Sequence, residues 1–127
     1  MVVNMAASRE RALELADRLH AMGPVTVTRF FGGAALRKDG VLFAFIIESI
    51  LYMRVDDAGR ARFAALGASP FVYAGRTQSV KVSGYYEVPD DIADDMDEFT
   101  LWAEAAYRIA LAAKKPVKGR QARRRDV

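Results

Sequence analysis

This sequence of 127 residues has no cysteine and only one histidine, His20. The absence of cysteine excludes disulfides, thiolate metal ligands and a cysteine nucleophile, and a single histidine excludes a histidine-rich metal site or a two-histidine mechanism. The longest apolar run, residues 41–47, is far shorter than the roughly 18 residues of a membrane span. Residues 1–9 lack the basic and apolar regions of a secretory signal, so we expect a cytoplasmic protein.

The common catalytic motifs are also missing. The sequence contains no Gly-x-Ser-x-Gly, His-Glu-x-x-His or Gly-x-x-x-x-Gly-Lys-Ser/Thr pattern, and no carboxylate pair is placed for acid–base chemistry. His20 has neither a nucleophile nor an orienting partner, so we interpret it as structural or exposed. Residues 31–33 are too short for a phosphate loop and indicate a bulge or turn with positive φ. We therefore predict a protein that is not an enzyme and binds neither cofactor nor metal.

Basic charge is concentrated at the C-terminal end. Residues 114–127 carry a net charge of +6, whereas residues 1–113 carry −3, so we divide the chain into a domain and a basic tail at this point. Such a tail is either a solvated, disordered terminus or a contact for nucleic acid or another anionic surface. Its candidate phosphate contacts are Lys114, Lys115, Lys118, Arg120, Arg123, Arg124 and Arg125.

A second charged run, residues 87–98, holds seven acidic side chains and no basic one. Carboxylates bind hard cations, but the residue spacing of a calcium loop is absent. The run is better interpreted as the start of a helix, where the positive end of the helix dipole favours acidic side chains.

Hydrophobic periodicity predicts a helix over residues 4–22, ended by Gly23 and Pro24. A second long helix is expected to begin near Asp95 and to end at Pro116. A shorter helix reaches Leu66 and is capped by Asp56 or Asp57. Strands are predicted between these helices, at residues 25–31, 41–47, 50–55, 70–73 and 80–88. Residues 34–37 are either a short return strand or part of a connection.

The predicted fold is an α+β domain of two layers, an antiparallel sheet with helices in the order α-β-β-β-α-β-β-α. The strand at residues 41–47 is apolar on both faces, because Phe43 and Phe45 alternate with Ala44 and Ile46. An antiparallel strand with one solvated face would be polar on that face. The second face is covered either by another subunit or by the termini of the same chain, and we favour a homodimer. The strand tyrosines fit a core or subunit contact better than base stacking, because few basic residues accompany them.

Several short segments stand in a characteristic order. They are residues 29–33 (RFFGG), Leu36, residues 39–46 (DGVLFAFI), 51–56 (LYMRVD), 70–73 (PFVY) and 85–89 (YYEVP), and Trp102 with Ala103. Together they resemble the N-terminal domain of the TfoX/Sxy family of bacterial competence regulators. The resemblance marks these residues as structural or interaction positions: Arg29, Phe31, Gly32, Gly33, Asp39, Gly40, Phe43, Tyr52, Asp56, Pro70, Phe71, Tyr86, Pro89 and Trp102.

This resemblance implies a compact α+β domain with an antiparallel sheet, a non-enzymatic regulatory or interaction role, and no catalytic residues. The family usually has Met where Phe30 stands and often Lys where Arg54 stands. Full-length competence regulators carry a second, helical domain where this sequence has its basic tail, so a competence activator's whole role is not carried over. The prediction is a non-enzymatic regulatory module acting as a homodimer. The alternative is a nucleic-acid-associated protein that contacts phosphates through the tail.

Overall fold

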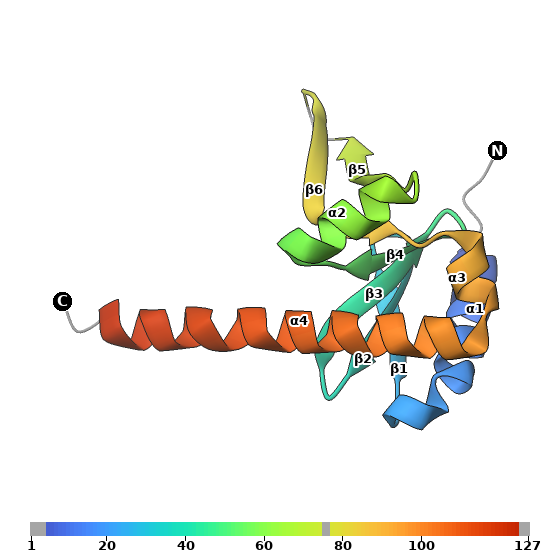
Figure 1. Ribbon diagram of the computed structural model, residues 1–127, viewed down its shortest axis with the longest axis horizontal. Helices are drawn as coiled ribbons and strands as arrows, with labels where there is room; N and C mark the ends of the chain where they lie inside the picture. Colours follow the sequence, from blue (N-terminus) through green and yellow to red (C-terminus); the bar gives the residue numbers. More distant parts are fainter. Residues whose placement is uncertain (1–4, 75–76, 125–127) are drawn as a thin grey trace.

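The computed structural model describes the backbone of residues 5–74 and 77–124 (Figure 1). Along the chain, one long helix precedes the strands and another follows them, and a short helix lies between the fourth and fifth strands. In chain order the elements are α1 (Met5–Arg18), the 3-10 helix η1 (His20–Met22), β1 (Thr26–Phe30), β2 (Gly33–Lys38), β3 (Val41–Ile47), β4 (Ile50–Arg54), α2 (Asp57–Ala65), β5 (Pro70–Ala74), β6 (Ser79–Glu87), α3 (Asp90–Asp94) and α4 (Met96–Arg124).

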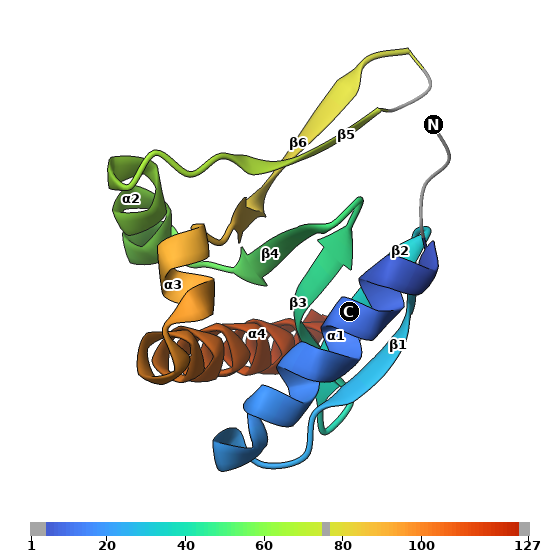
Figure 2. The same cartoon turned by 90° about the vertical axis from the view of Figure 1, so that its right-hand side faces the viewer.

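The strands form one six-stranded antiparallel sheet in the order β1-β2-β3-β4-β6-β5. Helix α1 packs on β1, β2 and β3, and α4 packs on β3 and β4, so both cover the same face of the sheet (Figure 2). The predicted α+β class is therefore confirmed. Four strands precede α2, one more than the predicted order, because residues 33–38 pair with β1 and β3 instead of forming a connection.

The hydrophobic core lies between the sheet and the two long helices. Phe99, Ala103 and Ala106 of α4 are at most 2% exposed, and the two alanines let α4 approach the sheet closely. The Arg18 guanidinium joins the first helix to the last, since it donates a hydrogen bond to the Ala93 carbonyl oxygen at 3.0 Å and lies 5.8 Å from the centre of the Phe99 ring. Other large core side chains are Leu15, Leu19, Met22, Leu36, Phe43, Ile46, Leu51, Met53 and Phe63.

A β-bulge at Phe43 changes which face of β3 this residue occupies. Leu36 pairs with Ala44 and Arg37 pairs with Leu42, so Phe43 has no partner on β2. Its ring packs against Tyr107 of α4, with ring centres 6.5 Å apart. The prediction that Phe43 and Phe45 share a face is therefore wrong, because the extra residue of a bulge interrupts strict alternation.

The helix starts follow the sequence signals. Asp56, and not Asp57, caps α2, because its Oδ1 accepts a hydrogen bond from the Gly59 N–H at 2.8 Å. Asp95 Oδ1 accepts hydrogen bonds from the backbone N–H groups of Asp97 at 3.1 Å and Glu98 at 3.2 Å at the start of α4. The acidic run of residues 87–98 thus supplies the first turns of two helices, α3 and α4, as its charge pattern indicates.

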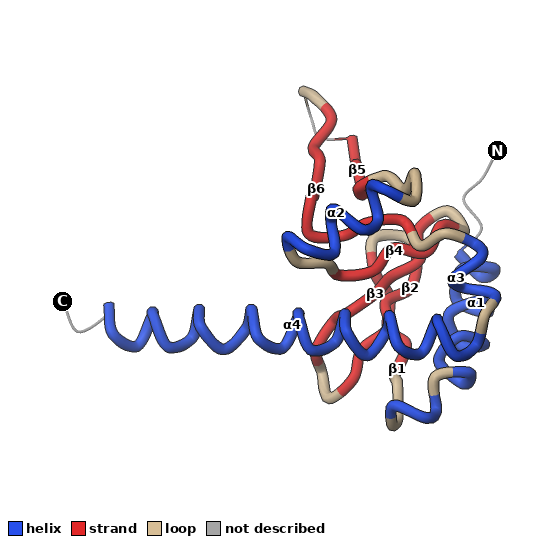
Figure 3. The backbone as a smooth tube through the Cα atoms, in the orientation of Figure 1, coloured by secondary structure: helices blue, strands red, loops and turns tan. Residues whose placement is uncertain are grey.

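The C-terminal end of α4 differs from the prediction. The helix continues through Pro116 to Arg124 and projects well past the sheet (Figure 3). The predicted end at Pro116 is therefore wrong for the backbone. Proline has a helical φ and weakens a helix interior by about 3 kcal/mol, but it does not by itself set the last residue. Residues 125–127 and the side chains of the basic tail lie outside the described residues, and the division between domain and tail stays a prediction.

Candidate functional site

The residues that carry the family resemblance fall into four groups in the structure. Turn residues with positive φ are Phe31, Gly32, Asp39 and Gly40. Phe43, Tyr86 and Trp102 belong to the core or pack against it. Strand, cap and end positions are Arg29 on β1, Gly33 at the start of β2, Asp56 before α2, Pro70 at the start of β5 and Pro89 before α3. Only Phe31, Tyr52 and Phe71 come together, and they line one groove.

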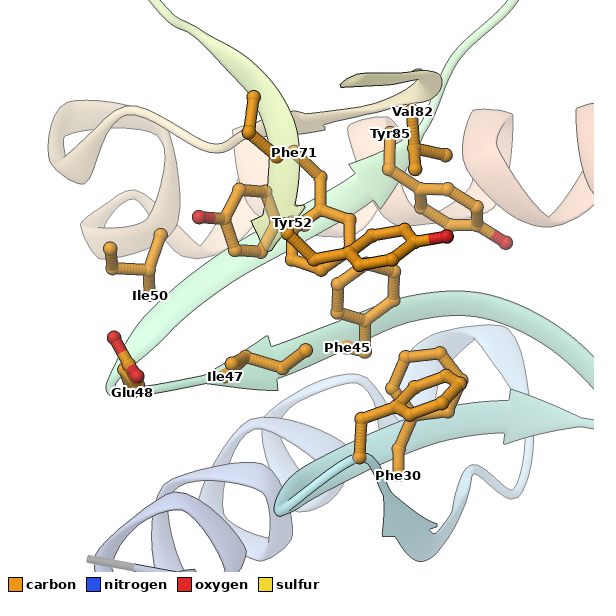
Figure 4. A pocket seen from close by; sticks show the side chains of 12 residues that line it. Phe30, Phe45, Ile47, Glu48, Ile50, Tyr52, Phe71, Val82 and Tyr85 are labelled. Atoms are coloured by element: carbon orange, nitrogen blue, oxygen red, sulfur yellow. The ribbon is translucent and has the colours of Figure 1, made fainter. Parts of the chain in front are cut away.

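This groove, here called the aromatic groove, lies on the sheet face opposite α1 and α4 (Figure 4). Its volume is about 500 Å³. Five strands and one turn contribute aromatic rings to it: Phe30, Phe31, Phe45, Tyr52, Phe71, Tyr73 and Tyr85. The alternation of β3 explains the position, since Phe45 points away from Ala44 and Ile46, which belong to the core beneath the helices.

Phe45 forms the floor of the aromatic groove. Its ring centre lies 4.6 Å from that of Phe30, 4.8 Å from Tyr85, 5.0 Å from Phe71 and 5.4 Å from Tyr52. Each aromatic pair of this kind contributes about 0.5–1.5 kcal/mol beyond the burial of its area. The cluster therefore holds the β5–β6 hairpin against the central strands.

Strand β6 lies between β4 and β5, and its pairing with β5 is irregular beneath the groove. Pro70 of β5 pairs with Tyr86, but the next residue, Phe71, pairs with Val82, so the register against β5 shifts between them. On the other side of β6, Tyr85 pairs with Arg54 of β4. Gly84 lies within this irregular stretch of β6. A Cβ at Gly84 would lie 3.2 Å from Arg54 Nη1, which leaves little room for a side chain. This irregularity lets both Val82 and Tyr85 face the groove.

The floor of the groove is buried, but its rim is open to solvent. Phe45 is 2% exposed, whereas Phe31 is 83%, Val72 49% and Tyr73 47% exposed. Among the described residues, the partial cover over β3 comes from β5 and β6 and not from the terminal helices. The alternative to a homodimer, that the chain's termini cover the second face, is therefore wrong for the part of the chain that the structure describes, because α1 and α4 both pack on the other face.

Acidic and basic side chains lie near different tyrosines of the groove. Burial raises the pKa of Tyr52, and the negative charges of Glu87 and Glu48 raise it further. Burial also raises the pKa of Tyr85, but the positive charges of Arg54 and Arg37 oppose this rise. The Arg54 guanidinium lies 5.6 Å from the centre of the Tyr85 ring. Acidic groups therefore accompany Tyr52, and basic groups accompany Tyr85.

Trp102 lies apart from the aromatic groove, between α2 and α4. Its ring packs edge-on against Phe63 with centres 4.7 Å apart, and the Arg62 guanidinium lies 4.6 Å from the centre of the indole. The indole N–H donates a hydrogen bond to Glu98 Oε1 at 3.2 Å. These contacts anchor α2 to α4, which gives Trp102 a structural role.

Reactive groups do not converge at the aromatic groove. His20 is exposed near the end of α1, and its Nδ1 donates a hydrogen bond to the Asp17 carbonyl oxygen at 3.2 Å. Within residues 5–74 and 77–124, no three histidine or carboxylate side chains form a metal-binding cluster. No helix in the same residues has the length and apolarity to cross a bilayer. The groove instead offers apolar surface, aromatic faces and the phenol groups of Tyr52, Tyr73 and Tyr85.

Sequence reasoning missed Phe30 and Tyr85 as groove residues. It singled out Tyr86, whose side chain packs against the core while the adjacent Tyr85 faces the groove. Alternation within β6 separates these neighbours, but only the pairing of Tyr86 with Met53 and of Tyr85 with Arg54 shows which face each one occupies. The apolar character of both faces of β3 was the one signal in the sequence for this surface.

Comparison with known proteins adds a family assignment. The model of the TfoX N-terminal domain matches residues 17–110, which include every strand and the helices that cover them in part or whole. No curated protein matches the chain. Because the match spans most of the sequence and the observed fold has the expected α+β class, the chain belongs to the TfoX N-terminal domain family.

Proposed function

We propose that this protein is a non-catalytic regulatory module that works through protein contacts, and that it forms a homodimer through the aromatic groove. Membership of the TfoX N-terminal domain family supports a module of the competence-regulator kind. The observation that carries the proposal is the open rim of the groove, where Phe31, Val72 and Tyr73 are about half exposed or more. Large exposed apolar patches mark interaction sites in soluble proteins.

The chemistry of the groove favours a protein partner. Aromatic side chains are enriched in the buried centres of protein interfaces, where they fill pockets on the facing surface. The groove combines a rigid floor at Phe45 with protruding side chains on the same face, so one surface supplies both the cavity and the groups that fill it. Such a surface is suited to a two-fold dimer, in which the same patch is used by both copies.

A charged side chain on the rim is expected to weaken this dimer. Val72 is 49% exposed on β5 and lines the groove, so Val72→Lys places an ammonium group in the interface while the buried floor stays intact. We expect the dissociation constant to rise at least about tenfold, equivalent to about 1.4 kcal/mol. Sedimentation velocity or light scattering over a range of chain concentrations measures this change.

Leu101→Lys is the matched control. Leu101 is an aliphatic side chain of similar exposure, 58%, but it lies on α4 away from the aromatic groove. This variant should dimerise like the wild-type chain. A wild-type chain that stays monomeric at every concentration would contradict the proposal, as would equal dissociation constants for the two lysine variants.

The basic tail supports a second candidate function, the binding of nucleic acid. The tail carries a net charge of +6, and the backbone of its residues 114–124 continues α4 away from the sheet (Figure 1). We expect the affinity for duplex DNA to fall with salt at a log–log slope of about −0.9 per phosphate neutralised. Fluorescence anisotropy with a labelled duplex measures the slope. Truncation after Ala113 should abolish binding, and an unchanged affinity and slope in the truncated chain would exclude this function for the tail.

A further inference from the structure

We infer that the two chains of the two-fold dimer pack with their strands antiparallel, and that each places its exposed Phe31 ring in the aromatic groove of the other. This inference rests on the proposed homodimer and specifies how the two copies meet. Three observations on the same sheet face carry it: the conformation of Phe31, the size of the groove, and the distribution of charge along it.

The backbone conformation and the solvent exposure of Phe31 are both unfavourable within its own chain. It lies in the turn between β1 and β2 with φ 44° and 83% of its surface exposed. Positive φ is unfavourable for a bulky residue, and Asn or Gly is preferred at this position of a two-residue hairpin turn. The only ring near it is that of Phe30, at 4.8 Å, among the aromatic contacts of the described residues. A partner that buries the Phe31 ring would offset the cost that the isolated chain leaves uncompensated.

The groove has room for such a ring. A cavity of about 150 Å³ is sufficient to bind benzene in a protein interior. The aromatic groove, with about 500 Å³, exceeds this and is lined by rings that form edge-to-face contacts. An inserted phenyl group would therefore find aromatic faces on Tyr52, Phe71 and Tyr85, which are available for further ring contacts.

The charges select the relative direction of the two copies. Phe31 and Glu48 lie in the two turns at one end of the groove, because Phe30 pairs with Gly33 and Ile47 pairs with Ile50 next to these turns. Arg37 lies toward the opposite end of the strands, and both Arg37 and Arg54 act electrostatically on Tyr85. An antiparallel two-fold dimer places Glu48 of each copy over the partner's Arg37, whereas the parallel arrangement brings like charges together.

The Phe31→Asn variant distinguishes an effect on dimer formation from an effect on the stability of the fold. Asn-Gly is favoured in this turn, so the urea midpoint of the monomeric chain should rise. Loss of a buried aromatic anchor should raise the dimer dissociation constant roughly thirtyfold. Both changes together support the inference. A Phe31→Asn chain that dimerises as tightly as the wild type overturns the inserted ring but leaves the proposed homodimer standing, because Val72→Lys still tests that dimer independently. A wild-type monomer overturns both.

A cycle of charge-reversal variants tests the relative direction of the two copies. Glu48→Arg and Arg37→Glu should each weaken the dimer, because each leaves like charges facing one another, and the double variant should recover most of the wild-type affinity. Glu14→Arg is the control, since Glu14 is exposed on α1, on the other side of the sheet. A double variant that is as weak as the sum of the two single changes overturns the antiparallel arrangement, whereas the inserted ring is tested by Phe31→Asn alone.

Discussion

The Gly33→Ala variant is expected to lose its folded state under ordinary conditions. Gly33 begins β2 and pairs with Phe30, and an added Cβ would overlap the Ile46 carbonyl oxygen on β3. The same Cβ would lie 3.0 Å from the Ile46 carbonyl carbon and 3.2 Å from Ile47 Cα. These are backbone atoms inside the sheet, so relief of the overlap requires β2 and β3 to separate. We expect a loss of about 4 kcal/mol or more, comparable with the whole stability of many domains.

The adjacent glycine provides the control for this prediction. A Cβ at Gly32 would meet no atom within 4 Å, but its φ of 81° is unfavourable for alanine. Gly32→Ala should therefore cost only about 1 kcal/mol and remain folded. Circular dichroism during urea unfolding compares the two variants. Similar urea midpoints for Gly33→Ala and the wild type would show that the strands tolerate a closer approach than the structure implies.

Phe45→Ala is expected to destabilise the fold by about 3–5 kcal/mol, the range typical of a deleted core aromatic side chain. Phe45 is 2% exposed, and its ring contacts four others from β1, β4, β5 and β6. Because this ring joins the β5–β6 hairpin to the central strands, its removal should loosen the hairpin before the rest of the sheet. Hydrogen exchange should therefore accelerate most at the amides of β5 and β6.

Phe45→Leu separates the lost volume from the lost aromatic contacts. Leucine keeps an apolar side chain of intermediate size, so we expect a cost between those of the wild type and Phe45→Ala. Dimer formation should fall in both variants, since the floor of the aromatic groove positions its rim. An unchanged unfolding midpoint and an unchanged hydrogen-exchange pattern in Phe45→Ala would show that the ring cluster contributes little to the fold.

The elements predicted correctly depend on local patterns. Apolar residues at helical spacing identified α1, and the cap at Asp56 identified the start of α2. Positive φ at Asp39 and Gly40 likewise suits this dipeptide, which is favoured in tight hairpin turns. In each case the residues that specify the element lie within a few positions of one another, so their physical preferences can be read from the sequence.

The predictions that the structure contradicts concern features that local patterns do not determine. The bulge at Phe43 depends on how β2 aligns with β3, and β2 itself is a strand because partners on both sides supply its hydrogen bonds. Pro116 disfavours a helix interior, but it does not determine where α4 ends. These features depend on pairing and backbone geometry beyond the reach of residue preferences.

The sequence by itself determines the α+β class of the domain and the family to which the chain belongs. It also shows that β3 is apolar on both faces, so that both faces need cover. The strand order β4-β6-β5 determines which side chains meet on the uncovered face. It brings Phe71 and Tyr85, which are far from Phe45 in the sequence, into contact with the Phe45 ring. Local preferences cannot encode such a meeting, because its energy arises only when distant strands pair in one register.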